Sequence, residues 1–378
     1  MKKSSGAIRR AGRPSGCRSV LIMAALLTLF GCAYPLTDQA ASAAGAQSAG
    51  MLAAVYVYDG SKTRYRDDDA EKIDQMFYSF ALFRQGRVSV SHWKNFKKFQ
   101  AYVKRHKNIM PILSVGGWGA DGFSQAASTA EGRAAFVSDV LKIMQENGFS
   151  GVDIDWEYPG SSAAGIKSSP EDRENFTLLL QAMRSGLDRL TMQDGIPRRL
   201  CVALSGSPEL IANLACDKIG KTVDQVNLMT YDLQQPDQAS HHSALYSSHP
   251  AALSADACVQ AYIKAGIPAG KLMLGAAFYG HQWLTHYESP LYLPAVKRST
   301  LSYAAIIKLI TKTPGAAQYD DRAQAPYFAN GKIFISYDDE RSIAQKAAYA
   351  QEHGLMGLFA WEYSSEPTGT LIDAMQPK

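Results

Sequence analysis

Several features are scarce in this chain of 378 residues, and each scarcity excludes a kind of site or a class of protein. Cysteine occurs only 5 times, and none of the cysteines has the spacing of a zinc site. The apolar run at residues 20–30 is too short to cross a bilayer as a helix. Acidic residues are absent from residues 1–31, which carry six basic ones, so the net charge of +4 becomes −2 without them. The nearly neutral remainder lacks the basic patch that nucleic-acid binding requires.

The first 31 residues have the order of an export signal, in which a basic start precedes an apolar run. The run ends in "LFGC", and this resembles the lipobox of bacterial lipoproteins, whose cysteine becomes a lipidated first residue. Phe30 is unusual in that pattern, and ordinary cleavage near Ala33 or Ala44 is the alternative. We expect a signal peptide at residues 1–31 and an exported protein, either secreted or tethered to a bacterial membrane through a lipidated Cys32.

The chain after the signal divides into a linker and one large folded part. Residues 32–50 are rich in Ala, Ser and Gly, which predicts a flexible linker before a domain at 51–378. Three cysteines remain in that domain, Cys201, Cys216 and Cys258, and an odd number cannot all pair. A Cys201–Cys216 bridge and burial of all three as small apolar residues are equally compatible with the sequence.

From residue 51 onward, short apolar or β-branched runs alternate with longer helical patterns. Such alternation indicates parallel strands joined by helices, and eight strands is the number that closes a (β/α)8 barrel. The eight runs are residues 53–58, 75–83, 109–117, 151–158, 199–207, 225–233, 271–280 and 354–363. We therefore predict an α/β fold, a (β/α)8 TIM barrel, with a doubly wound sheet as the alternative.

Two gaps between these runs have clear helical patterns. Apolar residues recur at helical spacing in residues 132–148, and Gly148 is a suitable end for that helix. A second helix is predicted over residues 171–190.

The gap before the last run is longer than any other and predicts a small α+β insertion at about residues 284–337. Within it, residues 327–339 predict a hairpin around Asn330–Gly331. A helix over residues 339–354 should follow, capped by Asp339 and ended by Gly354.

The run "GVDIDWEY" at residues 151–158 carries acids at every second position, Asp153, Asp155 and Glu157. Alternate residues of a strand share a face, so the acids would point into the barrel, while apolar residues such as Trp156 would pack on the helices. Glu157 would lie nearest the mouth, where barrel active sites are found. Enclosure and mutual repulsion raise carboxyl pKa values, which suits a general acid. An antiparallel edge strand with a solvent-facing acidic row is the alternative.

The sequence "SGVDIDWEYP" resembles the D-x-x-D-x-D-x-E signature of glycoside hydrolase family 18, the chitinases and their relatives. Three further segments resemble family motifs in the same order: "LSVGGWG" (113–119), "NLMTYDL" (227–233) and "LFAWEY" (358–363). The resemblance covers essentially residues 51–378. It implies an enzyme that cleaves β-1,4 bonds of chitin or chitooligosaccharides by a substrate-assisted retaining mechanism through an oxazolinium intermediate.

The resemblance also implies four catalytic roles. Glu157 would protonate the leaving oxygen and then deprotonate the incoming water. Asp155 would bind the acetamido N–H of the substrate and stabilise positive charge, while Asp153 would share a proton with Asp155. Tyr231 would donate its hydroxyl to the acetamido carbonyl oxygen.

Candidate substrate-binding residues lie on or just beyond the predicted strands. Trp361 would form the floor of the sugar pocket, because a flat indole matches the apolar face of a pyranose. Trp118 and Trp283 are expected on loops at the rim as stacking platforms, with plain packing as the alternative. Tyr56, Tyr78 and Phe80, on the first two predicted strands, are candidates for completing the pocket. The full set of substrate-binding candidates is Trp361, Met229, Asp232, Gly116, Gly117, Trp118, Tyr56, Phe80 and Trp283.

Gly116 and Gly117 are expected to leave room beneath Asp153. The chain departs from the family pattern at Ser150, where the signature has its first acid, and at His281, where an arginine often follows Tyr–Gly. These differences affect the surroundings of the acids and the rim of the cleft more than the expected reaction.

We expect no cofactor and no metal. His92, His106, His281 and His286 have no metal-like arrangement in the sequence and are interpreted as surface or loop residues. The expected partner is the carbohydrate alone, bound by a monomer. Two other functions remain open, an endo-β-N-acetylglucosaminidase acting on N-glycans or peptidoglycan, and a non-catalytic carbohydrate-binding protein. The presence of Glu157 with both aspartates disfavours the second.

Overall fold

The computed structural model describes residues 50–376 except 235–236 and 314–316. The predicted signal peptide at 1–31, its Cys32 and nearly all of the linker lie outside the described residues. In the described part, no helix has the length and apolar character needed to span a membrane.

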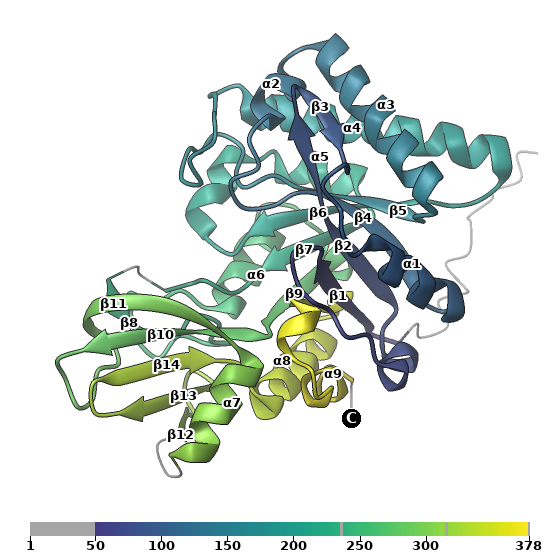
Figure 1. Ribbon diagram of the computed structural model, residues 1–378. Helices are drawn as coiled ribbons and strands as arrows, with labels where there is room; N and C mark the ends of the chain where they lie inside the picture. The colour runs from purple at the N-terminus through teal and green to yellow at the C-terminus, as the bar shows by residue number, and fades with distance from the viewer. Residues whose placement is uncertain (1–49, 235–236, 314–316, 377–378) are drawn as a thin grey trace, which may run out of the picture. The chain divides into compact units, whose positions relative to one another are not determined.

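Eight parallel strands form a closed barrel, and each of them overlaps one of the eight predicted runs (Figure 1). The barrel closes because β1 pairs with both β15 and β2, which excludes the doubly wound alternative. A short strand, β3 (Arg87–Ser89), adds to β2 in antiparallel fashion. The barrel strands are β1 (Leu52–Tyr58), β2 (Gln75–Arg84), β4 (Met110–Gly116), β5 (Gly151–Asp155), β6 (Arg199–Ser205), β7 (Gln225–Met229), β9 (Leu272–Ala277) and β15 (Gly357–Trp361).

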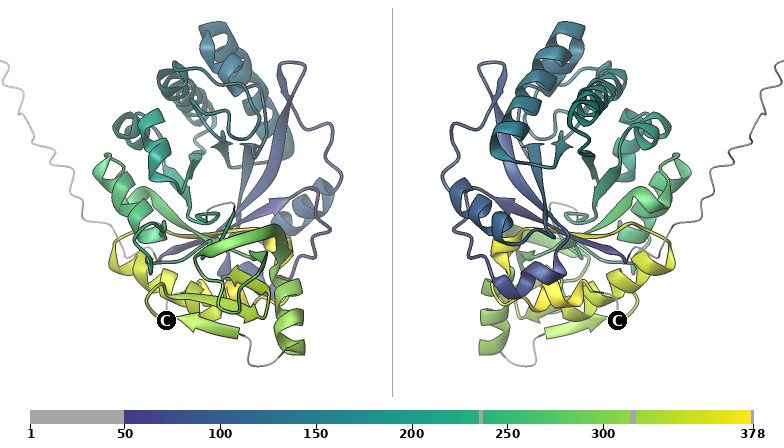
Figure 2. Two further views of the ribbon diagram at one scale, coloured as in Figure 1. Left: turned by 90° about the vertical axis from the view of Figure 1, so that its left-hand side faces the viewer. Right: turned by 90° about the vertical axis from the view of Figure 1, so that its right-hand side faces the viewer.

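Helices connect the strands and cover the outside of the barrel (Figures 1 and 2). The α-helices are α1 (Phe96–Arg105), α2 (Phe123–Ser128), α3 (Ala130–Asn147), α4 (Asp172–Asp194), α5 (Cys216–Thr222), α6 (Ala255–Lys264), α8 (Glu340–Glu352) and α9 (Thr370–Ala374). Short 3-10 helices are η1 (Asp67–Lys72), η2 (Pro208–Asn213), η3 (Ala269–Lys271) and η4 (Tyr363–Ser365). Helices α3, α4 and α8 confirm the three helices predicted from the sequence.

The ends of these helices follow from local chemistry. Helix α3 ends at Gly148, whose φ of 76° is a left-handed conformation that glycine adopts without strain. Helix α8 begins at a capping box, in which the Asp339 carboxylate accepts from the Ser342 N–H and the Ser342 hydroxyl accepts from the Asp339 N–H. Both ends agree with the predictions for these helices.

A second, antiparallel sheet has the strand order β12-β13-β14-β10-β11-β8, and all of its strands except β8 lie between β9 and α8 in the chain. Its elements are β8 (Gln238–Ala239), β10 (Tyr279–Thr285), β11 (Leu293–Ser302), β12 (Ala317–Asp320), β13 (Ala325–Asn330) and β14 (Ile333–Tyr337), with helix α7 (Tyr303–Lys312). The hairpin predicted around Asn330–Gly331 is confirmed, since β13 and β14 pair up to Asn330 and Ile333. The insertion begins at Tyr279, before its predicted start, because β10 follows β9 almost directly.

Strand β10 starts at the C-terminal end of β9, so the insertion, drawn in light green, rises from the end of the barrel where the strands terminate (Figure 2, left). In addition, β11 pairs with β8, a segment that follows β7 in the chain. The insertion is thereby joined to two barrel loops.

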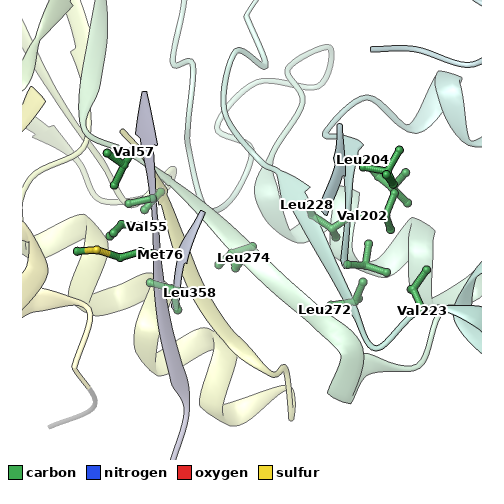
Figure 3. Close-up of a cluster of buried hydrophobic side chains, with 14 of the residues drawn as sticks. Val55, Val57, Met76, Val202, Leu204, Val223, Leu228, Leu272, Leu274 and Leu358 are labelled. Carbon is green, nitrogen blue, oxygen red and sulfur yellow. The ribbon is translucent and has the colours of Figure 1, made fainter. Parts of the chain in front are cut away.

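The main core fills the space between the outer face of the barrel and the surrounding helices. Figure 3 shows part of it, with Val55, Met76, Leu274 and Leu358 among the labelled side chains. Each is fully buried, and burial of such a side chain stabilises the fold by about 1.5–3 kcal/mol. A separate apolar cluster fills the interior of the barrel and includes Phe77, Ile112 and Phe359.

The three described cysteines are free thiols and buried. The Cys201–Cys216 bridge considered above is therefore wrong, and the alternative of buried small residues is correct. The physical reason is that Cys201 points into the barrel interior, whereas Cys216 lies in the outer core together with Cys258.

Candidate active site

The acidic row lies on β5, in the middle of the parallel sheet. Strand β5 pairs in parallel with β4 on one side and β6 on the other, which excludes the solvent-facing edge strand. Trp156 points away from the lumen and packs against Phe123 and Phe176 of the surrounding helices. The strand ends at Asp155, so Glu157 lies just beyond its C-terminal end.

Asp153 is the innermost acid and is fully buried. Its Oδ2 accepts hydrogen bonds from the hydroxyls of Ser114 (2.7 Å) and Tyr56 (3.0 Å). Asn227 orients the Tyr56 hydroxyl by donating to it at 2.8 Å. Burial raises the pKa of Asp153 to about 7, although the two hydrogen bonds oppose the rise. This carboxyl group therefore takes up a proton far more readily than an exposed aspartate.

Asp155 and Glu157 continue the row toward solvent. Burial, followed by the charges of Glu157 and Asp153, holds the pKa of Asp155 well above its usual range. Glu157 is half-buried, and burial raises its pKa to about 7, with a further increase from the charge of Asp232. Glu157 can therefore carry a proton near neutral pH while remaining open to a ligand, which is what a general acid requires.

A cleft of about 580 Å³ opens above this row, within the usual size range of ligand sites. One side belongs to the barrel and the other to β10 and β11 of the insertion. The lining residues are Tyr56, Phe80, Trp118, Asp155, Glu157, Tyr158, Ala203, Ser205, Ser207, Leu210, Met229, Tyr231, Asp232, Gln234, Tyr279, His281, Arg298, Thr300 and Trp361. Most of the candidate residues named from the sequence are thus brought together here.

Trp361 and its neighbours form an aromatic floor. Its indole stacks on Phe80 with ring centroids 5.7 Å apart and planes at 20°. Tyr56 and Tyr58 contact it at an angle, at 5.8 and 6.2 Å. Trp118 stands at the rim with 66% of its surface exposed. Flat apolar faces of this kind match the apolar face of a sugar ring.

The two glycines after β4 have a role that differs from the expected one. Gly116 and Gly117 both have positive φ, 125° and 92°. A Cβ on Gly116 would lie 1.9 Å from the Asp155 carbonyl oxygen, and one on Gly117 would lie 2.5 Å from the Phe80 ring. The Gly117 N–H also donates to that carbonyl oxygen at 2.9 Å. The glycines therefore make room beside Asp155 and Phe80, and the prediction that placed this space beneath Asp153 was wrong.

Two aromatic candidates lie outside the cleft. Trp283 lies on β10 rather than on a rim loop, where it is fully buried and packs with Phe334 and Ala239 in the insertion. By that point β10 has left the barrel, so other insertion strands cover its face. Tyr78 is also buried, on the helix-facing side of β2, where it donates to Asp59 and contacts Trp93. Packing, not substrate binding, accounts for both positions.

The expectation that His281 is a surface or loop residue was wrong. His281 is buried on β10, and its Nε2 lies 2.6 Å from Asp232 Oδ1. A second buried histidine, His242, has its Nδ1 3.7 Å from the same carboxylate oxygen. By contrast, His92 and His106 are half-buried and His286 is exposed.

Asp232 differs electrostatically from the β5 acids. Its side chain is open to the cleft, with 53% of its surface exposed, although protein surrounds it on several sides. That surrounding protein alone would raise the pKa of Asp232, but His242 and His281 reverse the effect and hold it well below its usual range. Burial lowers the pKa of His242, which keeps that imidazole neutral at neutral pH.

Asp232, His242 and His281 are also the described residues that could hold a metal ion, since their ligand atoms lie within 4.8 Å of one another. Thr300 and Arg298 line the cleft and His242 lies buried beside Asp232, and no pattern in the sequence indicated any of the three. The adjacent His241–His242 pair was visible, but its approach to His281 depends on how the insertion folds.

Comparison with known proteins decides the family. Residues 53–366 match the family model of the glycosyl hydrolases family 18. The chain belongs to this family. The resemblance seen in the sequence is thereby confirmed, and this family 18 protein is a glycosidase.

Chitinase A1 of Niallia circulans is 34% identical over 308 residues, which are 75% of this chain and 44% of that protein. The chain thus spans less than half the length of that curated relative. Among solved structures, a family 18 N-acetylglucosaminidase from Paenibacillus barengoltzii is 34% identical with a TM-score of 0.80, over 86% of this chain and 98% of that one. A mutant class V chitinase from Nicotiana tobaccum in complex with NAG4 is 25% identical with a TM-score of 0.77, over 86% and 97%.

Proposed function

We propose that this family 18 glycosidase hydrolyses β-1,4 bonds of N-acetylglucosamine polymers or oligomers by a substrate-assisted retaining mechanism. The observation that carries the proposal is the acidic row on β5, in which Glu157 opens to the cleft above an enclosed Asp155. The names of the similar chitinases and of the similar N-acetylglucosaminidase support this substrate class.

Glu157 supplies the proton. With a pKa of about 7, it is protonated in a large fraction of molecules near neutral pH and can donate to the departing glycosidic oxygen. The resulting carboxylate then accepts a proton from the water that completes hydrolysis, so the enzyme returns to its starting state.

The nucleophile is the substrate's own acetamido oxygen. A carboxylate that attacks carbon must be ionised, and the surroundings of Asp155 disfavour its ionised form. Asp155 instead accepts a hydrogen bond from the acetamido N–H and shares a proton with Asp153. The acetamido oxygen bonds to the anomeric carbon as the bond to the leaving oxygen breaks, which gives an oxazolinium ion.

Tyr231 lines the same cleft and donates its hydroxyl to the acetamido carbonyl oxygen, which fixes the attacking atom. Trp361 supports the sugar from below through its apolar face. Met229 and Asp232 complete the walls around that sugar.

The deciding experiment follows the products from a defined chitooligosaccharide by NMR with anomers resolved. The proposal requires the β-anomer as first product. It also requires that a substrate without the acetyl group on the sugar at the cleavage site react orders of magnitude more slowly, because the nucleophile is gone. An α-anomer, or equal rates on the two substrates, would rule out acetamido participation.

Peptidoglycan is a second candidate substrate, and one observation favours it. Arg298 lines the cleft, and within the described part of the chain no carboxylate forms an ion pair with it. A guanidinium in this place can bind a carboxylate on a sugar substituent. Rates on chitooligosaccharides, peptidoglycan fragments and N-glycans, measured with the protein and with Arg298→Gln, separate these substrates. A loss restricted to peptidoglycan fragments would favour the second candidate.

We also propose that the protein is exported and attached to a membrane through a lipidated Cys32, on the strength of the basic and apolar segments before that residue. Expression of the full chain in a bacterium and mass analysis of its N-terminus test this. The expected result is a diacylglyceryl-type modification on Cys32 and membrane association that Cys32→Ser abolishes. A soluble mature protein that begins after residue 32 would contradict it.

A further inference from the structure

Asp232, His242 and His281 converge on the side of the cleft that faces the β5 acids. They come from three separate segments: the loop after β7, the segment after β8, and β10. Their ligand atoms lie within 4.8 Å of one another. We propose that this cluster binds a divalent transition cation of the zinc class, and that the bound cation obstructs the sugar cleft.

The surroundings of His242 support a cation site. The side chain is fully buried, and neither ring nitrogen has a hydrogen-bond partner among the described residues. Buried polar atoms in native proteins are nearly always paired, so two unpaired nitrogens on one ring call for a partner. A neutral imidazole has one nitrogen with a free lone pair, which can bind a metal ion. A cation placed between His242 and Asp232 satisfies that nitrogen.

The orientation of His281 is the second argument. Its Nδ1 lies 3.2 Å from the Thr300 hydroxyl, and its Nε2 faces Asp232 Oδ1. The contact between Nε2 and Asp232 is a hydrogen bond in which Nε2–H donates. In the other tautomer, Nδ1–H donates to Thr300 and Nε2 presents its lone pair to the position between His281 and Asp232. Imidazole ligands of metals are commonly fixed in this way by a partner on their other nitrogen.

The two distances to Asp232 Oδ1 are close to those that a zinc-class ion requires. Two ligands held 2.0–2.1 Å from zinc at a tetrahedral angle lie roughly 3.3 Å apart. His242 Nδ1 and Asp232 Oδ1 are already 3.7 Å apart. His281 Nε2 and Asp232 Oδ1, at 2.6 Å, form a hydrogen bond and would have to separate by roughly 0.7 Å. Two imidazoles and one carboxylate with an open fourth position are a known ligand set for this class of metal.

The open position faces the cleft, because Asp232 and His281 both line it. A cation there takes the Asp232 carboxylate away from the sugar and occupies part of the sugar's space. Binding of the cation does not depend on the proposed function, but inhibition by it rests on that function. Sequence spacing could not indicate this site, since 39 residues separate His242 from His281 and no ligand pair shares a helical turn.

The direct test is titration of chelator-treated full-length protein with zinc chloride, followed by calorimetry. We expect about one equivalent to bind with at least micromolar affinity. His242→Asn should weaken binding by more than the roughly 10–100-fold that loss of an outer partner costs, and Thr300→Val should fall within that 10–100-fold range. His286→Asn, which removes an exposed histidine of the insertion, is the matched control and should bind as the unmodified protein does. No binding, or equal binding by His242→Asn, overturns the proposal.

A second measurement needs no variant and so does not depend on variant folding. Copper(II) bound to the unmodified protein should show, in its electron paramagnetic resonance spectrum, nitrogen couplings from two imidazoles. Couplings from fewer than two overturn the assigned ligands.

Enzyme kinetics test whether the bound cation obstructs the cleft. Zinc should raise KM for a chitooligosaccharide, and EDTA should reverse the effect. Zinc binding at the assigned ligands without any change in KM overturns the obstruction while leaving the site in place. A protein that binds zinc as described and hydrolyses none of the substrates contradicts the proposed function alone.

Discussion

The two sides of the cleft treat the same chemical group in opposite ways. On the barrel side, Asp153, Asp155 and Glu157 have pKa values raised by burial. On the insertion side, the pKa of Asp232 is held low by His242 and His281, although its surroundings alone would raise it. The difference lies in the partners, since hydroxyls and other acids surround the first group and imidazoles the second.

This contrast separates two tasks that carboxyl groups perform in one site. The β5 row keeps protons available for transfer, whereas Asp232 stays ionised and accepts hydrogen bonds or a cation. Environments that push carboxyl pKa values apart commonly mark acid and base assignments in enzymes. The four predictions below test this division of the cleft, beginning with the largest expected effect.

Glu157→Gln removes the transferable proton and should lower kcat by about 10²–10⁴-fold, the usual contribution of a general acid. The amide has nearly the same shape, so oligosaccharide binding measured by calorimetry should persist. Glu352→Gln, an exposed position on α8, is the control and should leave kcat unchanged. Normal turnover by Glu157→Gln would show that the barrel side does not supply the proton.

Tyr231→Phe removes a single hydroxyl on the barrel side and should lower kcat by about 10²–10³-fold, as loss of one positioned donor does elsewhere. Because the ring and its contacts with Tyr279 and Phe359 remain, thermal stability should change little. Steady-state kinetics on a chitooligosaccharide measures the effect. A change in KM with unaltered kcat would instead assign Tyr231 to binding alone.

Trp118→Ala removes an exposed ring at the barrel rim and should raise KM by roughly 2–10-fold, corresponding to about 0.5–1.5 kcal/mol of stacking. The matched control is Trp283→Phe, because Trp283 is buried in the insertion and does not line the cleft. That variant should unfold at a lower temperature but retain the KM of the unmodified protein. Equal KM effects from both variants would mean that Trp118 does not contact substrate.

The smallest expected effect is the influence of the Asp232 charge on the pKa of Glu157 across the cleft. The general acid must be protonated, so kcat/KM should fall as pH rises through about 7, the pKa of Glu157. The charge of Asp232 contributes to raising that pKa, so Asp232→Asn should move this alkaline limb to lower pH by a fraction of a unit. The pH profile is measured in buffer with EDTA, and the position of the limb is compared, not its height. An unmoved limb would show that the two sides do not interact electrostatically.

Local patterns in the sequence were sufficient for the barrel and the acidic row. The alternation of Asp153, Asp155 and Glu157 with apolar residues fixed which face of β5 each would occupy, because a strand repeats every two residues. The helix boundaries at Gly148 and Asp339 were also predictable, because capping depends on residues a few positions apart. These features involve contacts that are short in sequence.

The insertion side could not be predicted in this way. Strand β10 alternates as any strand does, but His281 faces Asp232 while Trp283, two positions later, is covered by Ala239 and Phe334. That outcome depends on where β10 leaves the barrel and which strands then cover it. The site of Thr300 likewise depends on the pairing of β11 with β10.

The barrel, the row of acids and the order in which they approach the cleft could thus be predicted from local patterns, since period and spacing are local properties. Which imidazoles contact Asp232, and which tryptophans line the cleft, depends on how the insertion packs against the barrel. Asp232 and His281 are 49 residues apart, and the free energy of such a contact is gained only once the two sheets have formed and packed.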